Sequence, residues 1–218
     1  MIHIAEHATG LPPELARLSP GVIRPRDVAH VYTNPRADLR RLARAGLLLR
    51  LATGYYARVP QHRIGDAIWR PDIHAAGLGI AQADYGIDDA ALVHVSAARR
   101  LGAIPREIAS AIVAVPKQRP DLNVLGGHIL FVKRDVASLD LQRTDTELGP
   151  GWTTTAEQTL LDLATARGRR LAEQAVVDEA IRSLGSTVDW DLVDQLAGQQ
   201  RKRAGAVRAR ALIEDDNA

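Results

Sequence analysis

His94 and Ser96 stand two positions apart, and their types could serve nucleophilic catalysis as base and nucleophile. A serine nucleophile is commonly presented on a sharp G-x-S-x-G turn, and no serine of the sequence has these neighbours. Neither a Walker loop nor a G-x-G-x-x-G phosphate loop occurs. The apolar residues around His94 instead predict a buried helix cap. We therefore expect a protein that is not an enzyme and that binds no cofactor.

The sequence gives equally little support to a metal site or to acid–base catalysis. His3 and His7 are four residues apart, as in a helical metal pair, but no H-E-x-x-H motif or nearby third ligand accompanies them. The sequence has no cysteine, which excludes disulfides, thiolate catalysis and zinc ribbons. Thr154 and Glu157 fit a capping box at a helix start, and Asp162 is expected on a helix surface or at a partner contact. We expect no metal site.

Arginines at helical spacing offer a different chemistry. Arg36, Arg40 and Arg44 recur every fourth residue, so they share one stripe of a helix, with Arg41 beside it. Leu39, Leu42 and Ala43 share another stripe that can pack on a core. A guanidinium group can pair with a phosphate or with the edge of a guanine in the major groove. The pattern predicts a helix that contacts DNA.

The neighbouring elements predict how this helix is held. Asn34 is a good N-cap, Pro35 a good first helical residue and Gly46 a good stop, so the helix should run from 35 to about 45. Two short helices, over 11–18 and 24–31, should precede it. Two β-prone runs, 47–51 and 55–59, should form a hairpin after it. This is the order of a winged helix-turn-helix; the alternative is a small helical domain whose arginines form a solvated face.

Charge is concentrated in the same region. The 218-residue chain has a formal net charge of only +2, yet its pI is about 9.2. Eight arginines and two aspartates lie between Arg24 and Arg58, and this local excess should dominate the field near the helix. The composition, with 46% hydrophobic residues, is that of a folded globular protein. No apolar run is long enough to cross a bilayer and the N-terminus lacks signal-peptide features, so we expect a cytoplasmic protein.

Residues 61–218 predict a larger α+β module with a small sheet and a helical tail, joined at about residue 60 to the winged helix of residues 1–60. Helices are expected over 64–83, from 154 through Ala164, and over 171–184, 190–196 and 204–213. Strands are expected over 110–116 and 128–134, with a short extended entry at 152–154. A basic stretch near the end could be a solvated helix, a second DNA contact or a toxin-binding surface; its members are Arg201, Lys202, Arg203, Arg208 and Arg210.

Three segments also resemble a known family. The run from Leu39 to Tyr56 resembles the N-terminal winged helix of AbiEi-type antitoxins. The segments His94 to Ala98 and Thr154 to Leu163 are similar to their His-x-Ser-Ala-Ala and Thr-x-x-Glu-x-Thr-Leu-Leu-Asp-Leu motifs. The resemblance implies an antitoxin that binds operator DNA, represses its own operon and antagonises a cognate nucleotidyltransferase toxin.

Specific residues are expected to carry the DNA contacts. In the groove we expect Arg36, Arg40, Arg41 and Arg44, and on the wing Arg50, Tyr55 and Arg58. Two alternatives stay open. One is a stand-alone winged-helix regulator whose C-terminal module senses a small molecule, and the other is an interaction scaffold that does not bind DNA.

Overall fold

The computed structural model describes residues 11–17, 21–165 and 171–214, and its N-terminal part is the predicted winged helix. A three-stranded antiparallel sheet of order β1-β3-β2 stands beside the helices. The elements are α1 (Pro13–Ala16), β1 (Val22–Ile23), the 3-10 helix η1 (Pro25–Val28), α2 (Pro35–Arg44), β2 (Leu48–Ala52) and β3 (Tyr55–Arg58). Thus the hairpin prediction is confirmed, and β1 adds a strand that was not predicted.

The helix predicted over 24–31 is wrong. Only one 3-10 turn forms there, because Pro25 holds the residue before it in an extended conformation. Asp27 then accepts a hydrogen bond from the backbone N–H of Arg24 at 2.8 Å, which closes the short turn.

Helix α2 begins and ends where predicted. The Asn34 side chain accepts a hydrogen bond from the backbone N–H of Ala37 at 3.4 Å, and Gly46 follows the helix with a φ of 74°. Leu39 and Leu42 are buried in a core made within the N-terminal part; the other buried members are Leu15, Ile23, Val28, Leu47, Leu48 and Tyr56. The apolar stripe of α2 therefore fixes the helix, and its arginine stripe faces outward.

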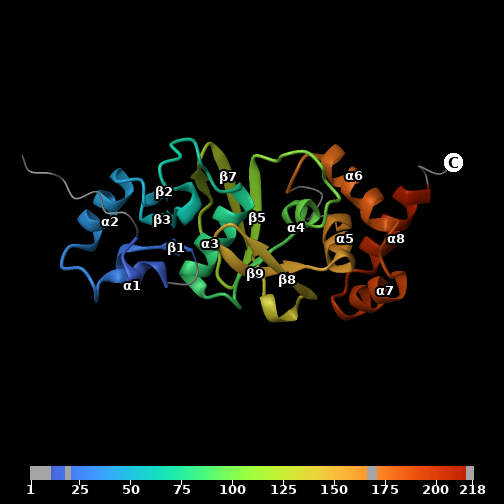
Figure 1. Cartoon of the computed structure of the whole chain (residues 1–218). Coiled ribbons are helices and arrows are strands. Elements are labelled where there is room, and N and C mark those ends of the chain that lie inside the picture. Colours follow the sequence, from blue (N-terminus) through green and yellow to red (C-terminus); the bar gives the residue numbers. More distant parts are fainter. Residues whose placement is uncertain (1–10, 18–20, 166–170, 215–218) are drawn as a thin grey trace, which may run out of the picture.

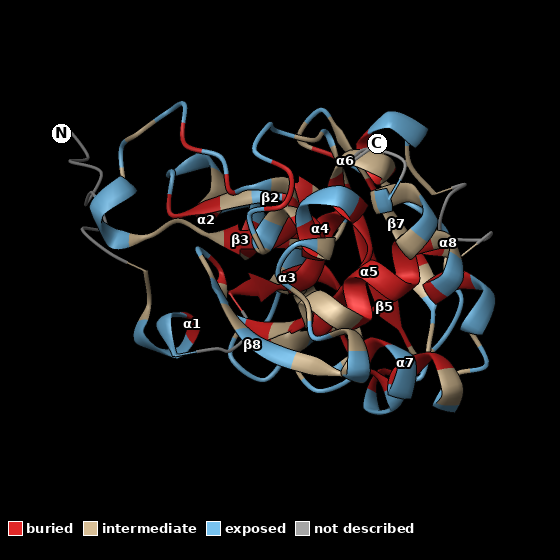
Figure 2. Cartoon of the chain, turned by 90° about the vertical axis from the view of Figure 1, so that its right-hand side faces the viewer, coloured by how far each residue is buried: buried red, intermediate tan, exposed pale blue. Residues whose placement is uncertain are grey.

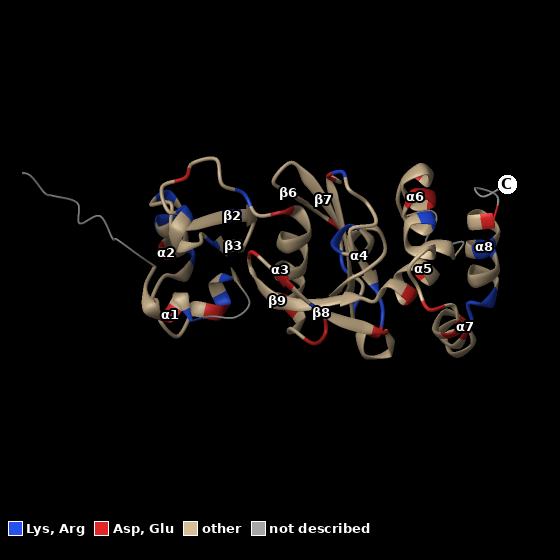
Figure 3. Cartoon of the chain, turned by 45° about the vertical axis from the view of Figure 1, so that its right-hand side comes forward, with Lys and Arg blue, Asp and Glu red and all other residues tan. Residues whose placement is uncertain are grey.

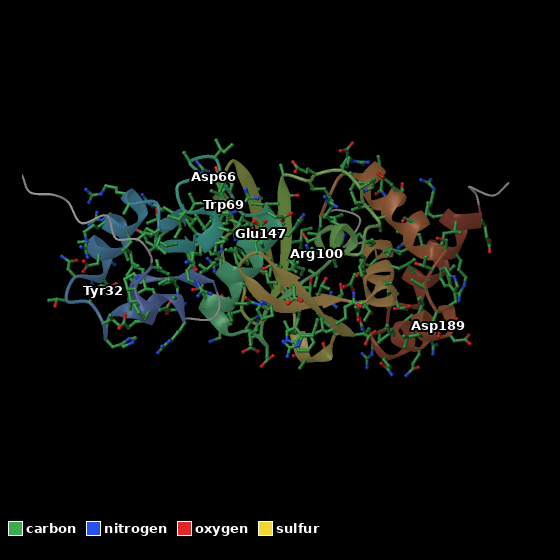
Figure 4. The ribbon with its side chains drawn as sticks, viewed as in Figure 1. Tyr32, Asp66, Trp69, Arg100, Glu147 and Asp189 are labelled. Carbon is green, nitrogen blue, oxygen red and sulfur yellow. The ribbon has the colours of Figure 1, made fainter. Side chains whose placement is uncertain are left out.

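The helix predicted over 64–83 begins nine residues later than expected. After η2 (Gln61–Arg63), Gly65 has a φ of 90° and Pro71 interrupts the chain, so α3 (Ile73–Tyr85) begins only after its N-cap Asp72. Asp66, Trp69 and Glu147 lie beside one another next to this segment (Figure 4). Trp69 donates from its ring nitrogen to Glu147 at 3.3 Å, which holds the connecting segment against the central sheet.

A six-stranded mixed sheet of order β6-β7-β5-β4-β9-β8 forms the centre of the molecule. Its strands are β4 (Ala91–Leu92), β5 (Ser110–Val115), β6 (Leu122–Val124), β7 (Gly127–Lys133), β8 (Leu141–Thr146) and β9 (Gly149–Thr154). The predictions of β5 and β7 are confirmed, and these two strands are parallel neighbours. Strands β4, β6 and β8 were not predicted, which is why the sheet is larger than expected.

Helices cover both faces of this sheet. Side chains of β5 alternate between the faces, so that Ala111 and Val113 pack towards α3 whereas Ile112 and Ala114 pack towards the helical tail. The tail consists of α5 (Ala156–Ala164), α6 (Gln174–Gly185), α7 (Trp190–Gln199) and α8 (Arg203–Glu214). The shorter helix α4 (Val95–Arg100) comes earlier in the chain and packs beside them. Figure 1 shows the winged helix and α6–α8 at opposite ends of an elongated molecule. The buried residues gather in the sheet, α3 and α5 (Figure 2).

Two predictions for α5 are corrected by its contacts. Its N-cap is Thr155, which accepts from the backbone N–H of Gln158 at 3.3 Å, so the capping box of Thr154 and Glu157 is wrong by one residue. Glu157 instead accepts a hydrogen bond from the backbone N–H of Asp189 at 3.1 Å, at the start of α7. Asp162 is buried, and not on a helix surface as predicted.

Helix α3 joins the winged helix to the central sheet through small residues. Val22, Leu51 and Ala57 of the winged helix are buried in one cluster with α3 and one face of the sheet. A Cβ placed on Gly79 would stand 2.6 Å from Cγ2 of Val22. The apolar core therefore crosses residue 60, and the winged helix is packed directly on the rest of the chain.

We predict that Gly79→Ala destabilises the protein although alanine favours helices. The added methyl group must displace Val22, and such overpacking costs about 1–3 kcal/mol, which exceeds the roughly 1 kcal/mol gained in helix propensity. Gly198→Ala in α7 is the matched control, because a Cβ there meets nothing within 4 Å and should stabilise. Urea unfolding of both variants checks this, and a stabilised Gly79→Ala variant would contradict the close approach.

His94 and Ser96 are both buried, as the sequence predicted. Ser96 accepts a hydrogen bond from the backbone N–H of Ile112 at 2.7 Å, and its hydroxyl is 3.1 Å from Nδ1 of the buried His74. This leaves the hydroxyl proton for Nδ1, an arrangement that suits a neutral imidazole. Burial lowers the pKa of His74, and the charges of Arg99 and Arg100 lower this pKa further. The charge of Asp72 acts in the opposite direction and raises it.

A pH dependence of stability follows from His74. Its pKa is lower in the folded chain than in the unfolded chain, so the unfolded state takes up the proton first as the pH falls below about 6.5. Stability from this group is complete above that pH and falls by at most about 1.4 kcal/mol per pH unit below it. Between pH 7 and pH 5.5, denaturant unfolding should show a smaller loss of stability for His74→Gln than for the parent protein. The exposed His62→Gln is the control and should behave like the parent.

Candidate nucleic-acid interface

Helix α2, η1 and the β2–β3 hairpin enclose a basic groove of about 700 Å³. Three of the predicted DNA-contacting arginines line it, namely Arg36, Arg40 and Arg50. Arg24 and Arg26 of the η1 region line the same groove and were not predicted. Figure 3 shows basic positions along α2, at the end of the molecule away from α6–α8. We call this surface the arginine groove.

The arginines of α2 are exposed and are held by local contacts. Arg40 donates from Nε to the carbonyl oxygen of Arg36 at 3.1 Å, and Arg41 pairs with Asp38 at 3.0 Å. Arg41 and Arg44 are exposed on the same helix but do not line the groove. The exposed Arg50 of β2 donates to the hydroxyl of Thr53 at 3.0 Å. Surface ion pairs are weak, so these guanidinium groups can exchange their partners for phosphates at little cost.

Tyr55 lies at the groove but its hydroxyl is engaged within the chain. It donates to Oδ2 of Asp84, the last aspartate of α3, at 2.7 Å. Burial raises the pKa of Tyr55, and the hydrogen bond to Asp84 raises it further. The guanidinium of Arg119 pairs with the same carboxylate and lies 4.2 Å from the ring centre of Phe131. Tyr55 therefore ties the wing to the central sheet, and its contact with DNA stays a prediction.

Arg58 faces away from the arginine groove. Its Nη1 donates to the carbonyl oxygen of Ala16 in α1, and it lines a different hollow, with Gly21 and Leu148. Burial lowers the pKa of its guanidinium. Arg58 thus joins β3 to α1, and a DNA contact by this side chain also stays a prediction.

Sequence reasoning missed the residues that hold the groove together. Arg24 donates to Asp84 at 2.7 Å and to Asp27 at 2.6 Å, whereas the side chain of Arg26 is 66% exposed. Asp84 is far from Arg24 and from Tyr55 in the sequence, and no local sequence pattern predicts that the three side chains are in contact. The run Arg24-Pro25-Arg26 at the start of the helix predicted over 24–31 was the available signal for two more basic groups at the groove.

Three residues of the terminal basic stretch contact other parts of the chain. Lys202 pairs with Asp162, Arg208 donates to the carbonyl oxygen of Ala164, and Arg210 pairs with Asp194 at 2.8 Å. Arg201 and Arg203 are exposed. A fully solvated basic helix is therefore wrong for Lys202 and Arg208, whereas the ion pair of Arg210 lies at the surface.

No cluster of three potential metal ligands occurs among residues 11–17, 21–165 and 171–214, and His3 and His7 lie outside them. In the same part of the chain, no helix has the length and apolar character of a membrane span.

A family model described as the transcriptional regulator, AbiEi antitoxin, matches residues 11–59. These are the residues of α1, α2 and the β1–β3 sheet, which carry the arginine groove. The match to the AbiEi antitoxin regulators is therefore confined to the N-terminal part of the chain. This match supports a DNA-binding antitoxin regulator.

A solved structure extends the similarity of fold to most of the chain. The crystal structure of the RV2827C protein from Mycobacterium tuberculosis has a TM-score of 0.56 and is 20% identical, covering 92% of this chain and 78% of that one. At this identity the similarity concerns the fold alone. No curated protein sequence matches the chain significantly.

Proposed function

We propose that this AbiEi-family protein is a cytoplasmic antitoxin with two activities. Through the winged helix of residues 1–60 it binds operator DNA upstream of its own operon and represses transcription. Through residues 61–218 it antagonises a cognate nucleotidyltransferase toxin. The observation that supports the DNA-binding activity best is the groove that gathers Arg36, Arg40 and Arg50, on the domain that matches the regulator family.

The groove suits the sugar–phosphate backbone and the edges of bases. The apolar stripe of α2 is buried, so the helix offers its arginine stripe to the major groove while the hairpin lies beside it. Arg26 adds a mostly exposed cation at the rim. We assign Arg36, Arg40, Arg41 and Arg44 to the major groove and Arg50 to the neighbouring phosphates. Tyr55 and Arg58 then act chiefly by holding the hairpin in place.

Growth rescue tests the antitoxin activity. The proposed cognate nucleotidyltransferase toxin is expressed with the full chain or with a full-length Arg40→Ala/Arg44→Ala variant. A truncation to residues 61–218 is a poor choice, because the buried cluster of Val22, Leu51 and Ala57 with α3 would lose its N-terminal members. Both variant side chains are exposed, so the fold should survive.

Each outcome has a distinct meaning. Rescue by both proteins supports neutralisation that is independent of DNA binding, and rescue by the parent alone means that the winged helix takes part in it. Failure of both soluble proteins to rescue growth contradicts the antitoxin activity. It favours the stand-alone regulator whose C-terminal module senses a small molecule.

A further inference from the structure

A cavity of about 530 Å³ lies between the central sheet and the helical tail. Val93 and His94 line it after the end of β4, and Val132 and Arg134 line it at the end of β7. Asp162 of α5 and Lys202, just before α8, close the opposite wall. Val93 and Val132 belong to the side of the sheet that packs on the helical tail, and the volume of the cavity is in the range of small-molecule sites.

Its polar wall contains two cations and one carboxylate. The side chain of Asp162 is only 6% exposed, with Arg134 at 2.8 Å and Lys202 at 2.6 Å. Gln158 also donates to this carboxylate, at 3.1 Å. The cluster therefore keeps one positive charge in excess in a place that is poorly screened by water.

The two cations retain donors for a ligand. Arg134 uses Nη1 for Asp162, and the described part of the chain gives no partner to its Nε and Nη2. Lys202 donates to Asp162 and to Gln200, both at 2.6 Å, and a third ammonium proton remains. Their side chains are 25% and 21% exposed, so both line the cavity without being sealed from it.

His94 adds an unusual backbone at the same cavity. It has φ 59° and ψ −135°, a conformation that is strained for a non-glycine residue. It forms a sharp turn from β4 into α4, and its side chain, 2% exposed, lines the cavity. Strain of this kind concentrates at binding sites, where the surrounding structure fixes a side chain.

We propose that this cavity binds a small organic anion. Its head group, a carboxylate or a phosphate, pairs with Arg134 and Lys202, and its apolar body packs on Val93, Val132 and Leu171. The planar guanidinium fork suits either oxyanion, because both accept two parallel hydrogen bonds. The cavity and the arginine groove share no lining residue, so the anion site can be tested independently of the DNA contacts.

Three probes with the same six-carbon body test this proposal on the full chain. Hexanoate, hexyl phosphate and hexanol are titrated by saturation-transfer NMR, so that only the head group differs. At least one anion should bind about tenfold more tightly than hexanol or better, which corresponds to about 1.4 kcal/mol. The anion that binds identifies the head group. Anions that bind no more tightly than hexanol would overturn the proposal.

Variants locate the site. Arg134→Gln should abolish the preference for the anion, whereas Arg106→Gln, which removes an exposed arginine paired with Glu179, should leave it unchanged. Val132→Phe should weaken all three probes by filling the apolar wall, and it decides the matter if Arg134→Gln fails to fold. A preference that survives Arg134→Gln, or binding that Val132→Phe does not weaken, excludes this cavity.

Discussion

Replacing Arg40 and Arg44 with alanine should weaken binding to operator DNA without unfolding the winged helix. Both side chains are exposed, whereas Leu39 and Leu42, which hold α2 on its core, are untouched. Each lost bidentate contact to a base should cost about 1–3 kcal/mol, or roughly 5- to 150-fold in affinity. Each lost phosphate contact should lower the slope of log K against log salt by about 0.9.

The two kinds of contact can be separated by titrating duplex DNA at several salt concentrations. A loss of sequence preference with an unchanged salt slope assigns an arginine to bases, and a lower slope with unchanged preference assigns it to phosphates. Arg106→Ala is the matched control, since it removes an exposed arginine that lies outside the winged helix. Folded Arg40 and Arg44 variants that bind like the parent would show that α2 is not the recognition helix.

Sequence reasoning located α2 well because its signals are local. Asn34, Pro35 and Gly46 mark the two ends within one short segment, and the apolar and basic stripes repeat at the helical period. The same holds for the hairpin, whose two strands pair across a short turn. Patterns confined to one short segment can be interpreted without knowing the rest of the fold.

The missed features depend on contacts between distant segments. Asp84 joins Arg24, Tyr55 and Arg119 from three other elements, and no spacing in the sequence relates them. Asp162 reads as a surface residue because it is a carboxylate on an amphipathic helix. Its burial depends on Arg134 and Lys202, which reach it from β7 and from the start of α8.

The contacts of Asp84 connect the winged helix to the central part of the molecule. The wing residue Tyr55 and the central residue Arg119 share one carboxylate, and α3, which carries it, also packs on β1 through Gly79. The arginine groove is therefore positioned by the central sheet as well as by its own small core. This explains why a cut at residue 60, although it follows the family match, removes part of a shared core.

Asp162→Ala should destabilise the protein by about 3–5 kcal/mol, because it leaves two partly buried cations without their carboxylate. Asp194→Ala is the matched control. It also removes an aspartate paired with a cation, but the Asp194 side chain is 53% exposed, and such surface pairs contribute about 0–1 kcal/mol. Urea unfolding at pH 7 measures the loss of stability in each variant. Equal losses in the two variants would contradict the burial of the Asp162 cluster.

A triple variant separates the fold from the anion site. Replacing a whole buried ion cluster with apolar residues of similar size is often neutral, so Asp162→Leu with Arg134→Met and Lys202→Met should recover most of the stability that Asp162→Ala loses. The same variant keeps the cavity walls but lacks both cations, so hexanoate and hexyl phosphate should bind it no better than hexanol. If the anion preference persists in this variant, Arg134 and Lys202 do not bind the head group.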